Sequence, residues 1–438
     1  MSLPNPIPLP AWVQTTLWVQ WPVASLLYFS RKFPEPFSIR MVGKRNFVVF
    51  SAPDAVEELF TKFTSAGNEE LRPFLGDNSL FLLQGMEHTK HRQLLMPLFR
   101  GERMRWHAEV MERVVAAAAR RMRPGQWVDV NALMQKITIE IIIISLFGVE
   151  TGGKFEFLRD KMADLVRMAN GPAMFFEFLR KDLGPLSPGR KICRTLDEIE
   201  KSVLAEILER KGDEAAAKLD AISILLSGKQ ENRLTPMELL DEIKTILAGG
   251  HESAAASLAW ALHLIQRDAG VMEKVQCEVH AANRAATTAE EVGMNTVSYL
   301  NAVCSETLRI YPAVPVVDRR LFSRARFQGR EFPVGVRLAA CSYLTHRRKD
   351  LFPEPEVFIP ERFQEKRFSP FEFYPFGGGN RRCIGAQFAP FQIKVVLFCL
   401  LSKVRFEPYS GKKVSVVQRG LTFGPSAANT LRIAEVMT

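Results

Sequence analysis

The sequence predicts a mainly α-helical fold with small β-sheets, on three observations. Apolar residues recur at helical spacings of three and four over most of the 438 residues. One candidate helix, from Thr235 to about Arg267, is much longer than the helices of ordinary globular proteins. Alternating patterns typical of strands cover only short stretches. With 47% apolar residues, the chain can bury one large core.

A β-hairpin is predicted near the N-terminus. Residues 37–50 are FSIRMVGKRNFVVF, which alternates and pauses at Gly43 and Lys44. Short strands are expected again after Pro315. Between them, the apolar periodicity predicts helices at roughly residues 53–64, 87–98, 103–123, 131–148, 155–169, 190–211 and 216–227.

The long candidate helix opens with Thr-Pro-Met-Glu, which offers an N-cap hydroxyl, a proline at the first helical position and Glu238 for a capping box. It would be about 50 Å long, and its apolar middle third is typical of a buried core helix. Gly249, Gly250 and Glu252 interrupt this middle third. Glycines and an acidic residue lower the stability of a buried helix, and such unfavourable residues often mark a functional site, although a simple helix kink is the alternative.

Composition argues against a membrane span. Charged residues make up 24% of the chain, and the mean hydropathy is −0.03. The most apolar N-terminal run, Leu17 to Phe29, is interrupted by Gln20 and Pro22 and covers about 13 residues, short of a span. Residues 1–35 are therefore expected to be amphipathic, without a transmembrane anchor. Because no basic region precedes the apolar run, a secretory signal is not indicated, and we expect a cytoplasmic protein.

No repeat, linker or low-complexity tract divides the sequence, so a single domain over residues 1–438, acting as a monomer, is expected. The six cysteines form no CxxC pair, which argues against a structural zinc site and a disulfide framework. A net charge of +10 and a pI of about 9.3 would suit nucleic acid, an anionic membrane surface or an acidic partner. Because no basic block of five residues occurs, nucleic acid is disfavoured and an acidic partner is favoured.

One short segment carries the most chemical information. Residues 376–385 are FGGGNRRCIG, followed by a helical pattern from Ala386 to Ser402. Cys383 thus lies near a helix N-terminus, beside two arginines, in a glycine loop whose amides can approach the sulfur closely. These features favour a thiolate. A haem iron with one axial cysteine requires such a ligand.

This segment resembles the haem-binding loop of the cytochrome P450 family, F-x-x-G-x-R-x-C-x-G, at Phe376, Gly379, Arg381, Cys383 and Gly385. The resemblance implies the cytochrome P450 fold, in which a long central helix lies over a buried haem b. It also implies that Cys383 is the axial iron ligand and that Phe376, Arg381 and Gly385 surround the cofactor.

Two further matches follow in the family's order. Glu306 and Arg309 resemble the family's E-x-x-R pair, one helical turn apart on the same face. Arg362, in the segment PERF at 360–363, resembles the residue that completes their network. The family's role for this network is structural, because it holds the region that carries the cysteine loop.

Four basic residues match the family's positions for the haem propionates. His88 and Arg92 resemble the pair on the helix that covers the propionates, at a spacing of four. Arg319 and Arg381 are placed like the family's other propionate arginines, with Arg320 as an alternative to Arg319. Any one of them, taken alone, is more simply interpreted as a solvated residue, but four in this pattern favour an anionic ligand.

The centre of the long helix resembles the family's oxygen-binding groove, [AG]-G-x-[DE]-T, as GGHES at 249–253. The resemblance implies that Ala248 and Gly249 line the haem and that Glu252 and Ser253 form a proton relay. Ser253 departs from the family's threonine: it keeps the hydroxyl but loses the methyl that fixes the rotamer. His251 is expected to be packed or hydrogen-bonded rather than an iron ligand.

The resemblance implies a haem-thiolate monooxygenase that hydroxylates or epoxidises a hydrophobic small molecule, fatty-acid-like or terpenoid-like, with dioxygen. Only about 55 residues follow Cys383, too few for a reductase domain, so electrons are expected from a ferredoxin or flavodoxin with its reductase. The segment MFFEF at 174–178 would suit either a lid over the substrate or a helix-packing face.

Two alternative functions stay open. One is a peroxygenase that takes its oxygen from hydrogen peroxide, which Glu252 and Ser253 disfavour. The other is a non-catalytic haem-based sensor or electron carrier, which needs neither a relay nor a substrate pocket.

Overall fold

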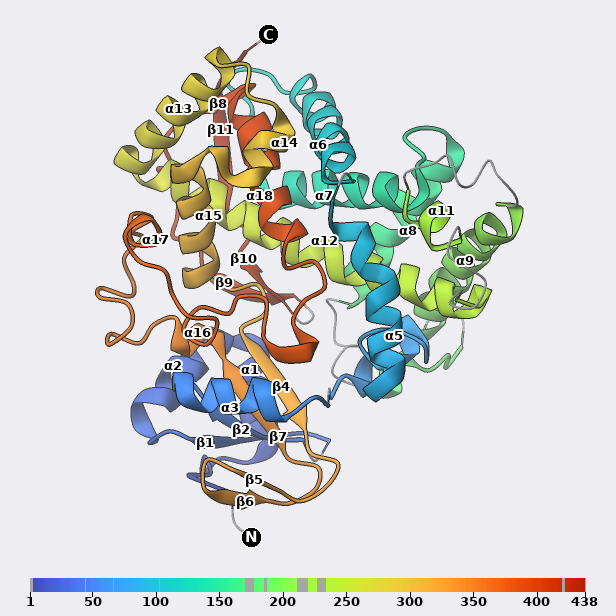
Figure 1. The fold of residues 1–438 in the computed structure, drawn as a ribbon, viewed down its shortest axis with the longest axis vertical. Coiled ribbons are helices and arrows are strands. Elements are labelled where there is room, and N and C mark those ends of the chain that lie inside the picture. The colour runs from blue at the N-terminus through green and yellow to red at the C-terminus, as the bar shows by residue number, and fades with distance from the viewer. Residues whose placement is uncertain are drawn as a thin grey trace.

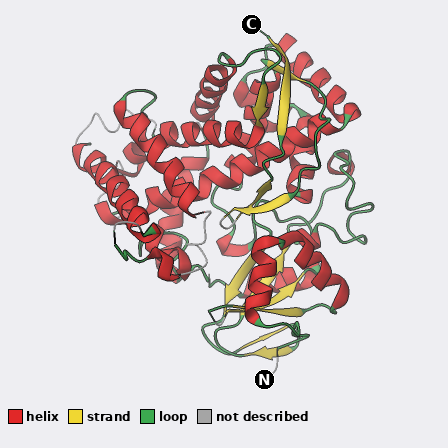
Figure 2. Cartoon of the chain, turned by 180° about the vertical axis from the view of Figure 1, so that it is seen from behind, coloured by secondary structure: helices red, strands yellow, loops and turns green. Residues whose placement is uncertain are grey.

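The computed structural model describes residues 3–43, 45–65, 67–101, 103–169, 177–184, 187–210, 220–226, 234–419 and 422–437. A strand-rich end holds the N-terminus, and a larger helical part holds the C-terminus (Figures 1 and 2). The expected fold class, mainly α-helical with small β-sheets, is confirmed. Residues 174–176 of the expected lid lie outside the described ranges.

The strand-rich end is built on a four-stranded sheet in the order β1-β2-β7-β4. Its elements are α1 (Ala11–Gln20), α2 (Pro22–Lys32), β1 (Phe37–Met41), β2 (Arg45–Phe50), α3 (Pro53–Lys62), β4 (Val316–Arg320), β7 (Arg337–Cys341) and α16 (Ser342–Thr345). β1 and β2 pair antiparallel with Phe37 opposite Val49, which confirms the hairpin. β2 runs parallel to β7, and β7 antiparallel to β4.

The remaining strands form three small sheets; those after Pro315 were expected, whereas β3 was not. They are β5 (Ala325–Phe327) with β6 (Arg330–Phe332), β9 (Val416–Arg419) with β10 (Thr422–Pro425), and β11 (Thr430–Val436) between β3 (Trp127–Asp129) and β8 (Val404–Phe406).

The other regular elements of the described chain are helices, joined by loops. They are α4 (Arg72–Leu75), α5 (Gly85–Leu95), α6 (Arg103–Ala119), α7 (Val130–Phe147), α8 (Gly153–Ala169), α9 (Pro188–Glu209), α11 (Ala221–Leu226), α12 (Pro236–Arg267), α13 (Ala269–Arg284), α14 (Ala289–Glu291), α15 (Ser298–Ile310), α17 (Arg362–Glu365) and α18 (Phe388–Leu401). The predicted helices are present with ends shifted by a few residues over the described ranges, but residues 216–219 and 227 of the helix expected at 216–227, and residue 211 of the one expected at 190–211, lie outside these ranges. α18 starts at Phe388 rather than at Ala386.

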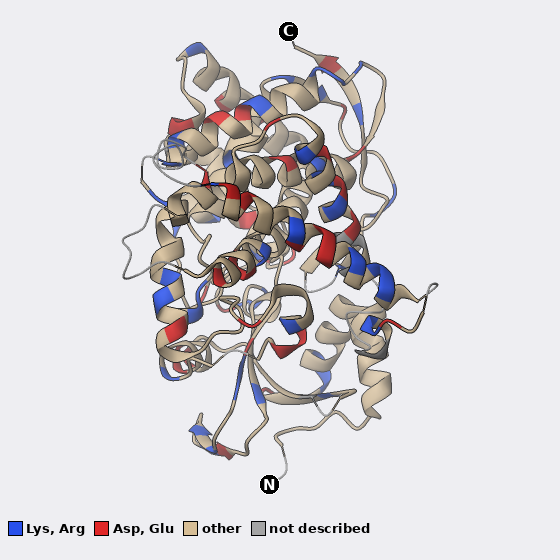
Figure 3. Ribbon diagram, turned by 90° about the vertical axis from the view of Figure 1, so that its right-hand side faces the viewer, with Lys and Arg blue, Asp and Glu red and all other residues tan. Residues whose placement is uncertain are grey.

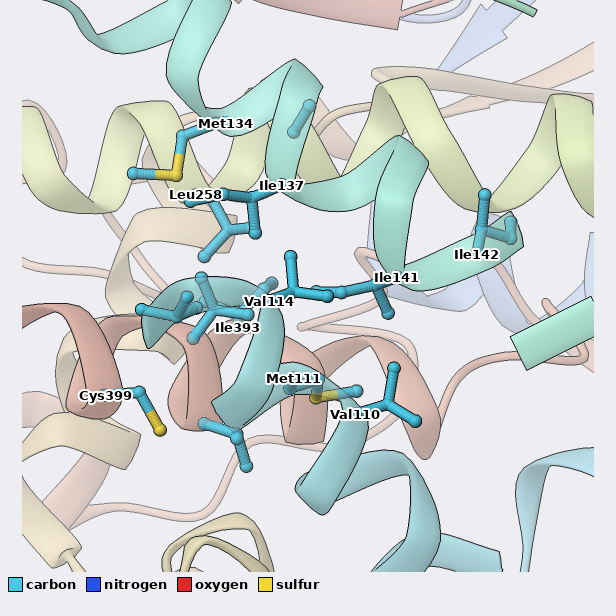
Figure 4. Close-up of a cluster of buried hydrophobic side chains, with 14 of the residues drawn as sticks. Val110, Met111, Val114, Met134, Ile137, Ile141, Ile142, Leu258, Ile393 and Cys399 are labelled. Atoms are coloured by element: carbon cyan, nitrogen blue, oxygen red, sulfur yellow. The ribbon is translucent and has the colours of Figure 1, made fainter. Parts of the chain in front are cut away.

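The long helix α12 is capped as predicted and lies in the core. The Oγ1 of Thr235 accepts from the Glu238 amide at 3.3 Å, and the Glu238 carboxylate accepts from the Thr235 amide at 2.7 Å. Apolar side chains of α6, α7, α12 and α18 meet in one cluster, which includes Met111, Leu258 and Ile393 (Figure 4). α12 is therefore buried along most of its length, and an exposed position in its middle indicates an opening in the packing around it.

Among the described helices, α7 alone is long and apolar enough to cross a membrane. However, 72% of this helix is buried inside the protein, and it packs against α6 and α12. Its apolar composition is that of a core helix.

Candidate functional site

The glycine loop before α18 is shaped by its contact with α3. Gly379 has a φ of +67°, in the left-handed region that favours glycine. A Cβ on Gly379 would lie 2.1 Å from the carbonyl oxygen of Phe60, and one on Gly378 would lie 2.1 Å from the Phe60 ring. The loop closes where the Cys383 amide donates to the carbonyl oxygen of Phe376 at 2.9 Å. Glycine is thus required for the loop to lie against α3.

Cys383 lies in this loop rather than in the first turn of α18. Its thiol retains accessible surface, although burial among protein atoms raises its pKa. The Gly385 amide, Arg92 and Arg382 act in the opposite direction and favour the thiolate.

The middle of α12 is open at Ala248 and Gly249, which are exposed although Leu247 and His251 on either side are buried. A Cβ on Gly249 would meet the ring of Phe81 at 3.3 Å. Gly250 has a different role, because a Cβ there would lie 2.5 Å from Cδ1 of Ile142 on α7. Gly249 therefore leaves an opening in the surface of α12, and Gly250 permits close packing of α12 against α7.

The two candidate relay residues, Glu252 and Ser253, lie one helical turn after the opening at Ala248 and Gly249. Glu252 and Ser253 are half-buried, and Ser253 Oγ donates to the carbonyl oxygen of Gly249 at 3.0 Å. His251 is buried, its Nδ1 lies 2.9 Å from Thr138 Oγ1 on α7, and burial lowers its pKa to about 4. His251 is thus a packed, hydrogen-bonded histidine, as expected.

The four candidate propionate residues form one basic cluster. The pKa of His88 is lowered to about 4, first by burial and then by the charges of Arg381, Arg92, His91 and Arg319. Burial lowers the pKa of Arg381 to about 10, with contributions from Arg319 and Arg92. Because the charged groups acting on His88 are all basic, an anionic ligand would stabilise this cluster.

Arg319 belongs to this cluster, and Arg320 does not. Arg319 is buried and donates to the carbonyl oxygens of Phe63 at 3.1 Å and Gly378 at 3.0 Å. Arg320 pairs with Glu69 at 2.6 Å instead. Since successive side chains of a strand point to opposite faces, only one of the two can face the cysteine loop.

Arg381 and the remaining loop residues are held by local contacts. Arg381 donates to the carbonyl oxygens of Thr64 at 2.9 Å, Leu80 at 3.2 Å and Leu83, and to Gln84 Oε1 at 2.7 Å. Phe376 packs against the main core, and a Cβ on Gly385 would lie 3.9 Å from the Cys383 sulfur. The loop is therefore tied both to the core and to the segment before α5.

The E-x-x-R network is present and fully buried. Arg309 donates from Nε and Nη2 to the two carboxylate oxygens of Glu306 at 2.7 and 2.8 Å. Arg362 Nε reaches the same carboxylate at 3.1 Å, and the Ile359 amide does so at 2.9 Å. Arg309 also donates to the carbonyl oxygens of His346 and Pro355. The network thus fixes the irregular chain before the cysteine loop, which is a structural role.

The sequence reasoning missed a buried contact of His91. Its Nδ1 lies 2.7 Å from Oε1 of Glu242 on α12, and its Nε2 lies 3.7 Å from Glu238. The contact attaches α5, which carries His88 and Arg92, to the long helix. Two acids one turn apart in a largely apolar helix were the available sign, since a buried carboxylate needs a basic partner.

Comparisons with known proteins agree with this architecture. The family model "Cytochrome P450" matches residues 3–430. "Putative cytochrome P450 135B1" of Mycobacterium tuberculosis is 31% identical over 412 residues, which cover 92% of this chain and 85% of that protein. "Putative cytochrome P450 137" of the same species is 25% identical over 415 residues, covering 93% and 84%. A solved structure, "Retinoic acid bound cyanobacterial CYP120A1", superposes with a TM-score of 0.84 at 23% identity over 99% of both chains.

The fold, the enclosed thiol and the basic cluster define a haem-thiolate protein. The chain belongs to the cytochrome P450 family, and it is an oxidoreductase, a monooxygenase with haem as its cofactor. The residues present fit this group: Cys383 offers an accessible sulfur, Ala248 and Gly249 leave an opening, and the basic cluster around His88 suits two propionates.

Proposed function

We propose that Cys383 is the axial ligand of a haem b and that His88, Arg92, Arg319 and Arg381 bind its propionates. The convergence of these basic groups on His88 supports the assignment, because their mutual repulsion is relieved by an anion. In the same proposal Phe376 and Gly385 shape the proximal loop, while Ala248 and Gly249 line the opposite side.

Haem with an axial thiolate supplies the activation of dioxygen for insertion of one oxygen atom into an unactivated bond. The proposed task of Glu252 and Ser253 is to bring protons from solvent into the site. The hydrogen bond from Ser253 Oγ to the carbonyl oxygen of Gly249 supports this role, because it holds the hydroxyl beside the exposed part of α12. A positioned acid and hydroxyl are what proton delivery requires.

The proposed reaction is the hydroxylation or epoxidation of a fatty-acid-like or terpenoid-like molecule. The contact between the Gly249 position and the Phe81 ring supports an apolar substrate, because it gives the opening an aromatic wall. The solved relative CYP120A1 contains retinoic acid, an apolar isoprenoid acid. The test is to screen hydrophobic compounds for a high-spin shift of the Soret band, and then to measure product formed per electron pair.

This test also separates the alternatives. A monooxygenase forms product in proportion to electrons supplied with dioxygen. A peroxygenase would form product from hydrogen peroxide alone, at a rate independent of Glu252 and Ser253. A sensor or electron carrier would form no product with any screened compound.

We propose that a separate acidic ferredoxin or flavodoxin, with its reductase, delivers the electrons to a cytoplasmic, single-domain monomer. Figure 3 shows Lys and Arg interspersed with Asp and Glu over the ribbon. Beside the cysteine loop, however, Arg100 and Arg382 are exposed and both act electrostatically on Arg92. Basic groups there would steer an acidic carrier, so the rate of reduction should fall as ionic strength rises.

A further inference from the structure

Helix α2 presents an exposed aromatic and basic face at the strand-rich end of the molecule. This α2 face consists of Trp21, Ala24, Tyr28, Arg31 and Lys32, all exposed, and Trp21 and Tyr28 are 59% and 52% accessible. Their spacing places them on one side of the helix. Large aromatic side chains are seldom left in water without a partner, so the face is a candidate interaction surface.

The α2 face is also hollowed. A shallow depression of about 430 Å³ is lined by Ala24, Leu27, Tyr28, Arg31 and Lys32. Within it, Lys32 Nζ donates to the Tyr28 hydroxyl at 2.9 Å and lies 5.4 Å from the centre of its ring. The basic and aromatic groups therefore form one continuous surface.

Within α1 and α2 the charged side chains are all basic, whereas Arg31, at the edge of the α2 face, also lines a neighbouring cavity with Glu35, Glu354 and Glu356. The first 34 residues contain no Asp or Glu, and within the described ranges neither Arg31 nor Lys32 forms an ion pair. Trp12, at the start of α1 in the same N-terminal segment, is a further exposed aromatic side chain, with 66% of its surface accessible. A second copy of the chain is a poor occupant, because pairing two α2 faces would bring like charges together.

We propose that the α2 face binds the surface of an anionic phospholipid bilayer, so that the enzyme associates peripherally with membranes. Trp and Tyr prefer the level of the lipid headgroups, and uncompensated basic side chains are attracted to anionic lipids. α1 and α2 have 10 and 11 residues and are separated by a turn at Trp21, too short to span a bilayer. The helix therefore lies on the membrane surface rather than across it.

The test is co-sedimentation of the haem-loaded protein with vesicles of phosphatidylcholine alone and of phosphatidylcholine mixed with phosphatidylglycerol. We expect binding to the mixed vesicles, weakened by salt, and little binding to the neutral ones. Trp21→Ser with Tyr28→Ser should lose most of this binding. The matched control is Trp127→Ser, since Trp127 on β3 is 62% exposed and should not contribute.

Charge reversal tests the electrostatic part separately. Arg31→Glu with Lys32→Glu should weaken binding to mixed vesicles by at least roughly fivefold per basic group. Arg120→Glu with Arg121→Glu, an exposed basic pair just after α6, makes the same charge change elsewhere and should have a small effect. Unchanged haem absorption verifies that each variant is folded.

Three outcomes would overturn the proposal: no binding of the wild type to mixed vesicles, equal binding to neutral vesicles, or equal loss in both charge-reversal variants. Loss of self-association in the Trp21 and Tyr28 variant, without a change in vesicle binding, would assign the α2 face to contacts between copies instead. Light scattering in the absence of vesicles measures that alternative.

Discussion

The carbonyl oxygen of Phe60 lies 2.1 Å from the point that a Cβ on Gly379 would occupy. Since this oxygen belongs to the backbone of α3, it cannot rotate away as a side chain would. The cysteine loop and α3 are therefore in contact through backbone atoms, and the position of Cys383 depends on a glycine four residues earlier.

Gly379→Ala should displace the loop and give protein with low haem content. The positive φ and the backbone clash together should lower the free energy of unfolding by at least about 2 kcal/mol. Gly377→Ala is the control, because Gly377 also has a positive φ of +64° but a Cβ there would only touch Val317 at 3.6 Å. That variant should lose about 1 kcal/mol and keep its haem. Haem content and urea unfolding measure both effects, and equal behaviour of the two variants would contradict this account.

Glu306→Ala should give haem-free or insoluble protein. It would leave two buried arginines without their carboxylate, at a cost of about 3 to 5 kcal/mol. Arg348→Ala is the comparison, because its ion pair with Asp350 at 2.8 Å is partly solvated and should contribute less than about 1 kcal/mol. A Glu306 variant that is folded, haem-replete and inactive would instead make the pair catalytic.

Ser253→Ala and Glu252→Ala should bind haem and substrate but divert electrons from product to hydrogen peroxide. A general acid-base group is typically worth about a hundredfold to ten-thousandfold in rate, so coupling should fall sharply. Ser253→Thr, whose added methyl limits the rotamer, should keep or raise the coupling. The measurement is product formed per electron pair.

Ser257→Ala is the control for the relay. Ser257 lies one turn further along α12 and donates to the Ser253 carbonyl oxygen at 2.9 Å, in the same i−4 geometry. It is buried away from the exposed stretch of the helix, so its loss should leave coupling unchanged. If Ser253→Ala behaved as Ser257→Ala does, the hydroxyl would have no part in proton delivery.

Acid should destabilise the fold through its buried histidines, and His251 allows the sign to be worked out. Its folded-state pKa of about 4 lies below the ordinary value of 6.5 because of burial. As the pH falls, His251 is therefore protonated in the unfolded chain before it is protonated in the folded protein. The stability that neutral His251 contributes is present above about pH 6.5 and is lost as the pH falls towards 4.

Between pH 7 and pH 5 the wild type should lose about 2 kcal/mol of its free energy of unfolding through His251, and His251→Gln should not show this part of the loss. Urea unfolding at the two pH values measures it, with His280→Gln on the exposed side of α13 as the control for loss of a histidine. An unchanged pH dependence in His251→Gln would contradict the buried, neutral state of this residue.

Local patterns predicted much of the fold. The hairpin at 37–50, the capped α12 and the helices on either side of it follow from apolar periodicity and capping chemistry, which act over a few residues. The start of α18 was predicted two residues early, because the turn after Cys383 is set by contacts of the glycine loop. The helices α1 and α2 were expected only as an amphipathic segment, because their packing against the sheet is a long-range contact.

The candidate site was predicted as a set of residues rather than as a geometry. The resemblance supplied Cys383 and the basic residues, but only the strand β4 decides between Arg319 and Arg320. The contact of Gly250 with Ile142 joins segments more than a hundred residues apart, so no local pattern reveals it. Glu238 and Glu242 were a local sign that the long helix needs a basic partner, but no local pattern identifies that partner as His91, which lies 151 residues from Glu242 in the chain.

The central claim is that the Cys383 thiolate binds the haem iron, and the carbon monoxide difference spectrum of the reduced protein tests it most directly. The wild type should show the red-shifted Soret band of a thiolate-ligated ferrous haem. Cys383→Ser, which removes only the sulfur, should lose that band, whereas the exposed-cysteine control Cys277→Ser should keep it. A Cys383→Ser protein that retained the thiolate band would show that another residue binds the iron and would contradict the account.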